Sequence, residues 1–147
     1  MSRRVLVVCV GNICRSPTAE ILFRHYFPGL AVSSSGICAL SGCGMDPMAS
    51  EVLEAHGLDG SGHIACQLYD NLVYRADLVL GVERAHVKML KEQVPQASER
   101  IFLLDRCNGR DIPDPYRQQR PAFDRAYDMI DVAVKSWLPD LSSESGA

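Results

Sequence analysis

The sequence predicts an α/β fold, a small doubly wound sheet of four parallel strands with helices on both faces. Two observations predict it. Four short apolar or β-branched runs alternate with segments of helical periodicity. The connections between these runs are also long enough for the helical crossovers that parallel strands need. The expected strands cover residues 5–10, 30–34, 77–82 and 100–104.

Length and composition indicate an ordinary globular protein. At 147 residues the chain fits a single domain, 1–147, that can bury a core without disulfides or metal ions. Apolar residues make up 47% of it and the formal net charge is only -3, which excludes a disordered chain and a basic nucleic-acid-binding surface. No apolar run could span a membrane and no cleavable signal region is recognisable. We therefore expect a cytoplasmic protein with reduced thiols, no nucleic-acid partner, no membrane insertion and a flexible tail at 142–147.

The first crossover begins at a strand that reads as fully buried, residues 5–10. Apolar side chains then recur at the i, i+3, i+4 and i+7 positions of one helix face, at Ala19, Leu22, Phe23 and Tyr26. Ser16 is the expected N-cap of this helix, Pro17 is expected at its first position, and Pro28 ends it.

Three further helices follow from the same periodicity, with approximate bounds 46–57, 84–94 and 122–137. Asp46 and Pro47 open the first of them and Gly57 closes it. Pro95 and Pro139 are expected to end the other two.

Reactive side chains gather in the turn between the first strand and the first helix, residues 7–17, which read VVCVGNICRSP. Such a turn collects unpaired backbone N–H groups, and the helix adds the positive end of its dipole, so the turn is suited to an anion. Gly11 and Asn12 tolerate the left-handed backbone angles that the cradle requires. At its floor Cys9 is expected to be a thiolate nucleophile, because the amides, the helix dipole and Arg15 all favour the charged form.

Two neighbours of Cys9 complete this phosphate-sized site. The planar fork of Arg15 can hold two oxygens of a tetrahedral oxyanion. Ser16 is near enough in sequence to donate a hydrogen bond to the Cys9 sulfur, which would help the thiolate leave in a two-step reaction. The alternative makes Cys9 a small core residue and Arg15 a solvated surface charge. The position of the pair, between an apolar strand and a helix start, favours the site.

A second loop can supply an acid. The longest irregular stretch, residues 105–121, contains the motif IPDPY, and a loop of that length is more often functional than idle. Pro113 and Pro115 would stiffen the presentation of Asp114, a candidate general acid for a leaving group that must be protonated. Taken alone, Asp114 reads as a turn residue. Asp111 is a weaker competitor that lacks the flanking prolines.

The stretch CVGNICRSPTAE, residues 9–20, resembles the signature of low-molecular-weight protein tyrosine phosphatases, and IPDPY resembles their acid loop. Both motifs stand in the order and spacing of that family, and the similarity extends from Val5 to about Trp137. Arg117 and Arg120 follow the acid loop where many members have glycines, which resembles the bacterial branch associated with capsule and exopolysaccharide synthesis.

The resemblance implies a division of roles. Cys9 would attack phosphorus and become a phosphocysteine, Arg15 and the loop amides would hold the oxygens, and Asp114 would be the general acid. The substrate-contacting residues that it implies are Val10, Gly11, Asn12, Ile13, Cys14, Ser16, Leu40 and Tyr116. Leu40 and Tyr116 would form apolar walls that make the pocket deep enough for phosphotyrosine. Leu40 stands where many members have an aromatic residue, so the stacking on this side is weaker.

Three supporting residues are implied as well. Ser34, with Asn12, would hold the loop by side-chain hydrogen bonds. His63 and Glu83 would be a buried pair that braces the loop and its arginine, although His63 reads almost as well as a core histidine without a catalytic part.

No cofactor and no metal is expected, because no histidine and cysteine cluster has zinc-site spacing. The partner that the resemblance implies is a phosphotyrosine protein, specifically a bacterial tyrosine autokinase. Arg117 and Arg120 beside the cleft would attract its acidic, tyrosine-rich tail.

Two questions stay open at the level of sequence. A thiol-dependent arsenate reductase would use the same loop, but it needs two further cysteines as a relay, and Cys66 and Cys107 show no such spacing. Cys14 either forms a protective disulfide with Cys9 on oxidation or merely packs in the core.

Overall fold

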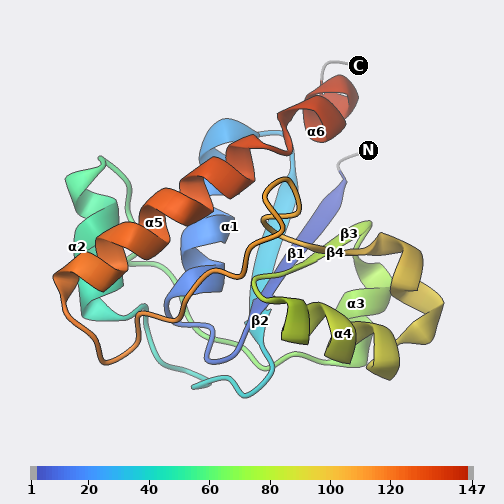
Figure 1. Ribbon diagram of the computed structural model, residues 1–147, viewed down its shortest axis with the longest axis horizontal. Helices are drawn as coiled ribbons and strands as arrows, with labels where there is room; N and C mark the ends of the chain where they lie inside the picture. Colours follow the sequence, from blue (N-terminus) through green and yellow to red (C-terminus); the bar gives the residue numbers. More distant parts are fainter. Residues whose placement is uncertain (1–2, 146–147) are drawn as a thin grey trace.

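Four parallel strands form one sheet in the order β2-β1-β3-β4 in the computed structural model, which describes residues 3–145 and their side chains up to residue 141 (Figure 1). The strands are β1 (Arg4–Cys9), β2 (Ala31–Gly36), β3 (Leu78–Gly81) and β4 (Ile101–Leu103). All neighbouring pairs are parallel. The predicted fold class is confirmed, and each strand lies within two residues of its expected bounds.

Helices cover both faces of this sheet. They are α1 (Arg15–Tyr26), α2 (Pro47–Ala55), α3 (Asp70–Arg75), α4 (Arg84–Gln93), α5 (Arg120–Lys135) and α6 (Leu138–Ser145), with a 3-10 helix, η1, at Pro95–Arg100. In Figure 1, α1, α2 and α5 lie to one side of the strands and α3 and α4 to the other. The sheet is therefore doubly wound.

Strand β1 explains why the sheet needs both layers. Val5 and Val7 pack into the cluster shared with α1, α2 and α5, whereas Leu6 and Val8 pack into the cluster shared with α3, α4 and η1. Successive side chains of a strand point to opposite faces, so a strand buried on both sides reads as a continuous apolar run. Because β1 lies between β2 and β3, the crossovers diverge at its carboxyl end, where ligands bind in open α/β sheets.

Some helix boundaries were predicted wrongly. Helix α1 begins at Arg15 with Cys14 as its N-cap and no side-chain cap, so Ser16 is not the cap and Pro17 is not the first helical residue. The Ser16 hydroxyl is engaged with Cys9 instead. Pro139 does not end a helix, because it lies in the first turn of α6, where the missing N–H of proline costs no helical hydrogen bond.

The C-terminal region differs from the expected one in extent. Helix α5 ends at Lys135, and α6 continues to Ser145, so the expected tail, 142–147, is helical in the part of its backbone that is described, while residues 146 and 147 lie outside the described range. Within residues 3–145, none of the helices combines the length and the apolar character that a bilayer crossing requires.

Candidate active site

The loop that leaves β1, taken from Cys9 at the end of the strand to Cys14, has every one of its backbone carbonyl oxygens hydrogen-bonded to a residue outside it. The donors are the backbone N–H groups of Ile37, Cys38, Leu40, Asp46 and Thr18 and the Nε2 of His63. Within the described part of the chain, the backbone N–H groups of residues 10–14 have no hydrogen-bond acceptor. Because all of these carbonyl groups point away from the centre of the loop, its backbone N–H groups are free to bind a ligand. The loop is thus a bowl of donors at the positive end of the α1 dipole, built for an oxyanion.

Cys9 ends β1 at the floor of this bowl and is buried. Its Sγ lies 2.9 Å from the hydroxyl of Ser16, and the Asn12 amide donates to that same hydroxyl at 2.8 Å. Because the Ser16 oxygen already accepts from Asn12, its own proton is available to the Cys9 sulfur. A sulfur that carries negative charge is stabilised by such a donor.

Asn12 ties the loop to the sheet. Its Nδ2 also donates to Ser34 Oγ at 3.0 Å, and its Oδ1 accepts from the Cys66 N–H at 2.9 Å. The side chain is fully buried and its φ is 59°, a left-handed angle that asparagine tolerates better than most residues. Gly11 was expected to share this conformation and does not, since its φ is not positive.

Arg15 is held by one of its two terminal nitrogens. Nη1 donates to the Glu83 carboxylate and to the carbonyl of Ile112, at 2.7 Å for the latter, while Nη2 lies 3.7 Å from Asp114 Oδ2. The side chain is 2% exposed although it lines the cleft. The guanidinium is therefore fixed through one nitrogen and leaves Nη2 to bind oxygen atoms of a ligand.

His63 and Glu83 do not form the buried pair that was expected. His63 donates through Nε2 to the Asn12 carbonyl at 2.6 Å, and Glu83 binds Arg15. Both side chains are only half-buried. Each braces a different part of the site, His63 the loop and Glu83 the guanidinium.

The acid loop brings Asp114 to the cleft and holds Asp111 away from it. Asp114 Oδ1 accepts from the Tyr116 N–H at 3.1 Å, and its side chain is 47% exposed. Asp111 instead accepts from the backbone and the guanidinium of Arg84, and these bonds lower the pKa of its carboxyl. A carboxylate held in its charged form is a poor proton donor, so Asp114 is the better candidate acid.

Cys9, Arg15 and Asp114 line one cleft of about 280 Å³. Its lining residues are Cys9, Val10, Gly11, Asn12, Ile13, Cys14, Arg15, Cys38, Leu40, Asp114, Tyr116 and Arg117. Leu40 and Tyr116, each about two fifths exposed, supply apolar walls at the rim. Arg120 was expected beside the cleft and is not there, because it pairs with Asp124 and with Glu51 of α2.

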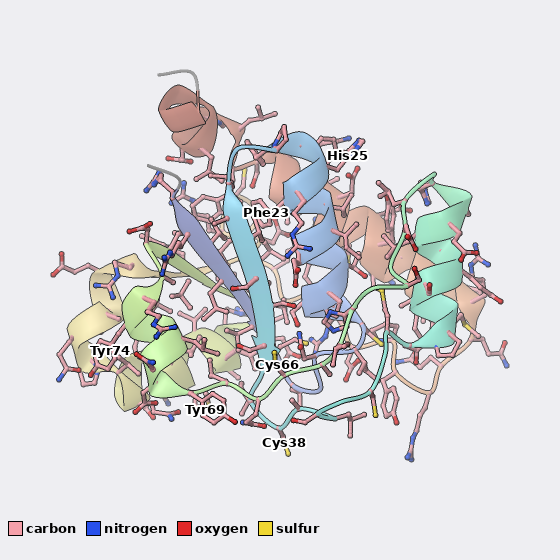
Figure 2. All side chains as sticks on the ribbon, turned by 180° about the vertical axis from the view of Figure 1, so that it is seen from behind. Phe23, His25, Cys38, Cys66, Tyr69 and Tyr74 are labelled. Atoms are coloured by element: carbon pink, nitrogen blue, oxygen red, sulfur yellow. The ribbon has the colours of Figure 1, made fainter. Side chains whose placement is uncertain are left out.

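The remaining cysteines are free thiols. Cys14 lines the cleft but is buried, and burial, with a further contribution from Asp46, raises the pKa of its thiol. Cys66 and Cys107 do not line the cleft. Figure 2 shows Cys38 at the lower edge of the molecule, in the loop that follows β2. Within the described residues, no group of three or more His, Cys, Asp or Glu side chains is placed to hold a metal ion.

Three contributors to the site escaped the sequence reasoning. Glu20 on α1 accepts from Ser34 Oγ at 2.6 Å, which extends the chain of hydrogen bonds from Cys9. Gln67 holds the rim loop through Ala39 N–H and the Ile37 carbonyl. Gly36 lets β2 approach the loop, because a Cβ there would lie 2.4 Å from the Val10 carbonyl oxygen. Only Gly36 leaves a signal in the sequence, as a glycine two residues after the predicted strand 30–34.

Comparison with known proteins identifies the family of the chain. The model of the family described as low molecular weight phosphotyrosine protein phosphatase matches residues 4–146. The chain is 46% identical over 141 residues to the probable low molecular weight protein-tyrosine-phosphatase EpsP of Ralstonia nicotianae, which covers 96% of this chain and 97% of that protein. Vibrio vulnificus Wzb, solved in complex with benzylphosphonate, has a TM-score of 0.91 and 40% identity, covering 96% of this chain and 100% of that chain.

A third similar structure limits what the fold alone implies. The YwlE arginine phosphatase from Geobacillus stearothermophilus has a TM-score of 0.89 and 30% identity, covering 97% of this chain and 94% of that chain. The fold alone therefore does not fix the amino acid that carries the phosphate. The match of the family model over nearly the whole chain places the protein in a family all the same: it belongs to the low molecular weight phosphotyrosine protein phosphatases, which are cysteine-dependent enzymes.

Proposed function

We propose that this enzyme hydrolyses phosphotyrosine in proteins in two steps, with Cys9 as the nucleophile. The observation that carries the proposal is the bowl of free backbone amides around Cys9, with Arg15 Nη2 and Asp114 at its mouth. A dianionic phosphoryl group fits this set of donors, and the sulfur lies where it can attack phosphorus from the side opposite the leaving group.

In the first step, the Cys9 thiolate forms an S–P bond while the bond from phosphorus to the tyrosine oxygen breaks. The electron pair of that bond goes to the phenolic oxygen, which Asp114 protonates. Arg15 and the loop amides hold the three equatorial oxygens, where charge is spread in the transition state.

In the second step, water attacks the phosphocysteine and gives a proton to the Asp114 carboxylate. The S–P bond breaks, the electron pair returns to sulfur, and inorganic phosphate leaves. The Ser16 hydroxyl, 2.9 Å from the sulfur, stabilises the thiolate as it departs.

The substrate class follows from the walls of the cleft. Leu40 and Tyr116 offer apolar surface to an aromatic ring at the rim, and Cys9 is buried at the floor, so we expect the cleft to favour phosphotyrosine over phosphate on a short side chain. The partner that we propose is a bacterial tyrosine autokinase that controls exopolysaccharide or capsule production, as the resemblance to that branch implies. The reaction requires a reduced Cys9, which the cytoplasm maintains, so the cytoplasm is the proposed location.

Phosphate release from an aryl phosphate tests the mechanism. We expect Cys9→Ser to abolish turnover and Asp114→Asn to lower kcat by about 2 to 4 orders of magnitude, the range typical of general acid catalysis. The matched control is Asp111→Asn in the same loop, which should keep kcat near that of the unmodified enzyme because Asp111 is bound to Arg84. Normal turnover by Cys9→Ser, or equal losses for Asp111→Asn and Asp114→Asn, would contradict the assignment.

Identification of the protein partner needs the trapped complex. Cys9→Ser retains the bowl and should retain a phosphotyrosine protein from an extract of the source cells. Recovery of a protein that carries phosphotyrosine but no kinase domain would refute the autokinase as partner, while leaving the phosphatase reaction intact.

A further inference from the structure

Arg117 is an exposed cation at the rim of the cleft, three residues after Asp114. Its guanidinium lies over the ring of Tyr116, with 5.3 Å between the guanidinium carbon and the ring centroid. No ion pair to a carboxylate is formed by Arg117 within residues 3–141. The other cation of the cleft, Arg15, is already paired with Glu83, so Arg117 offers the free positive charge at the mouth.

The backbone at this position favours glycine. Arg117 has a φ of 65°, and apart from Asn12 it is the one non-glycine residue in the described chain with a positive φ. A side chain in this left-handed region costs free energy that glycine would avoid. At Asn12 the buried hydrogen bonds of the side chain offset this cost. Among the side chains described up to residue 141, Arg117 has no hydrogen bond or ion pair that does so, and strained residues of this kind gather at ligand-binding sites.

We propose that Arg117 binds the carboxylate of an Asp or Glu that flanks the phosphotyrosine, so that the preferred substrates are acidic phosphotyrosine segments. Tyr116 would contact the ring of the phosphotyrosine, and the next residue, Arg117, lines the same cleft at its rim, where the substrate chain would enter. A planar guanidinium can bind a carboxylate through two parallel hydrogen bonds. Because the Arg117 guanidinium already stacks on Tyr116, its side chain loses less conformational entropy when it binds. This inference rests on the proposed function.

Arg120 provides the contrast on the same segment. It donates to Asp124 at 3.0 Å and lies 3.8 Å from Glu51, so its charge is compensated within the molecule. Of the two arginines that follow the acid loop, Arg117 is therefore the one whose charge is available to bind a carboxylate of the substrate.

The test compares two phosphotyrosine peptides that differ only in the residues next to the phosphotyrosine, Asp and Glu in one and Asn and Gln in the other. For the unmodified enzyme, kcat/KM should favour the acidic peptide about 5-fold, as expected of a favourable exposed ion pair. Arg117→Gly, which suits the φ at this position and removes the charge, should bring the ratio to about 1. Arg120→Gln is the matched control and should keep the ratio of the unmodified enzyme. Since each ratio is formed within one variant, a general loss of activity cancels.

Reversing the charge at position 117 distinguishes a role in substrate binding from a purely structural role, because only the former changes the charge preference for peptides. Arg117→Glu should prefer a peptide with Lys at the same flanking positions over the acidic peptide. In the unmodified enzyme the acidic preference should also shrink in about 1 M salt, where the screening length falls to about 3 Å. An unchanged ratio in Arg117→Gly, or no inversion in Arg117→Glu, would overturn the proposal.

Binding measurements separate this inference from the proposed reaction. The dissociation constants of the same two peptides can be measured by calorimetry with Cys9→Ser and with the double variant Cys9→Ser/Arg117→Gly. A charge preference in the first protein that is lost in the second supports the role of Arg117 even if turnover fails. Equal affinity of Cys9→Ser for both peptides refutes the role of Arg117, whatever the enzyme hydrolyses.

Discussion

At the scale of single residues, Asn12 does more than any other side chain to shape the site. Its side-chain Nδ2 donates to the hydroxyls of Ser16 and Ser34, and its side-chain Oδ1 accepts from the N–H of Cys66. Because the hydroxyl oxygens of Ser16 and Ser34 each accept from Asn12, each hydroxyl can donate its own hydrogen bond. Ser16 donates to Cys9 and Ser34 donates to Glu20. One buried amide thus sets the direction of a chain of hydrogen bonds that ends at the nucleophile.

Two substitutions separate the functions of Asn12. Asn12→Gly keeps the φ of 59° and removes the side chain, so it should lower the free energy of unfolding by about 1–3 kcal/mol for the buried groups left without partners. Asn12→Ala should cost about 1 kcal/mol more, because alanine also strains the left-handed backbone. Urea denaturation of both variants measures the difference, and an alanine variant at least as stable as the glycine variant would show that the backbone angle is not a constraint.

The roles of these residues were only partly predictable from sequence. Cys9, Arg15 and Asp114 stand in short motifs whose chemistry is local, so they could be named at once. Glu20 and Gln67 act through partners 14 and about 30 residues away, and no local pattern marks such a contact. Ser16 was predicted as the N-cap of α1, as a donor to Cys9 and as a substrate contact. The structure contains the contact with Cys9, whereas Cys14 is the N-cap and the buried Ser16 is not among the residues that line the cleft.

At the scale of elements, the carboxyl end of β2 presses directly against the loop. A Cβ at Gly36 would lie 2.4 Å from the Val10 carbonyl oxygen and 3.1 Å from the Asn12 side chain. The nearest atom belongs to the backbone, which cannot move out of the way as easily as the end of a flexible side chain. Any larger residue at Gly36 must therefore displace the loop that we propose to hold the phosphoryl group.

Gly36→Ala is accordingly expected to lower both stability and turnover. The clash should cost about 1–3 kcal/mol of unfolding free energy, as overpacking does. A displacement of the loop by an ångström can reduce turnover by about 10²-fold. Gly62→Ala is the matched control, because a Cβ there meets nothing within 4 Å. Aryl phosphate hydrolysis and urea denaturation of the two variants check this, and equal behaviour of both would contradict the close approach.

The strands and the longer helices were predictable from sequence, whereas α3 and η1 were not. The strands read correctly because burial on both faces gives unbroken apolar runs, and α1, α4 and α5 because their periodicity extends over at least ten residues. Helix α3 has six residues, too few for a periodic pattern, and η1 begins at the proline that was expected only to end α4. In short elements like these, tertiary contacts decide the structure, and one residue type such as proline can begin or end a helix.

At the scale of the whole molecule, the topology assembles the site from distant segments. The loop after β1 accepts hydrogen bonds from the segment after β2 and from His63, and the Asn12 side chain in it accepts from the Cys66 N–H before α3. At the end of the loop, Arg15 donates to Glu83 after β3 and to the Ile112 carbonyl in the acid loop. All of these lie at the carboxyl ends of the strands, near the point where the strand order reverses. The sequence predicted at which edge of the sheet the site lies, but it did not predict which residues contact each other there. His63 and Glu83 were expected to pair, and they instead bind the Asn12 carbonyl and Arg15.

One buried group should also link the stability of the whole fold to pH. His86 on α4 is 6% exposed, its Nδ1 has no hydrogen-bond partner among the described residues, and its Nε2 lies 3.8 Å from Glu83. Burial lowers the pKa of its imidazole below the ordinary 6.5, and this effect exceeds the opposing effect of Glu83. Between the lowered pKa and 6.5 the unfolded chain therefore binds more protons than the folded one.

It follows that the contribution of His86 to stability is complete above pH 6.5 and is lost as the pH falls through its folded pKa, by at most about 1.4 kcal/mol per pH unit. His86→Gln should flatten the unfolding free energy between pH 7 and about pH 5 relative to the unmodified protein. His25→Gln, at an exposed position of α1, is the control and should leave the slope unchanged. Urea denaturation at successive pH values measures the slopes. A His86→Gln slope equal to that of the unmodified protein would mean that His86 takes up its proton as readily folded as unfolded.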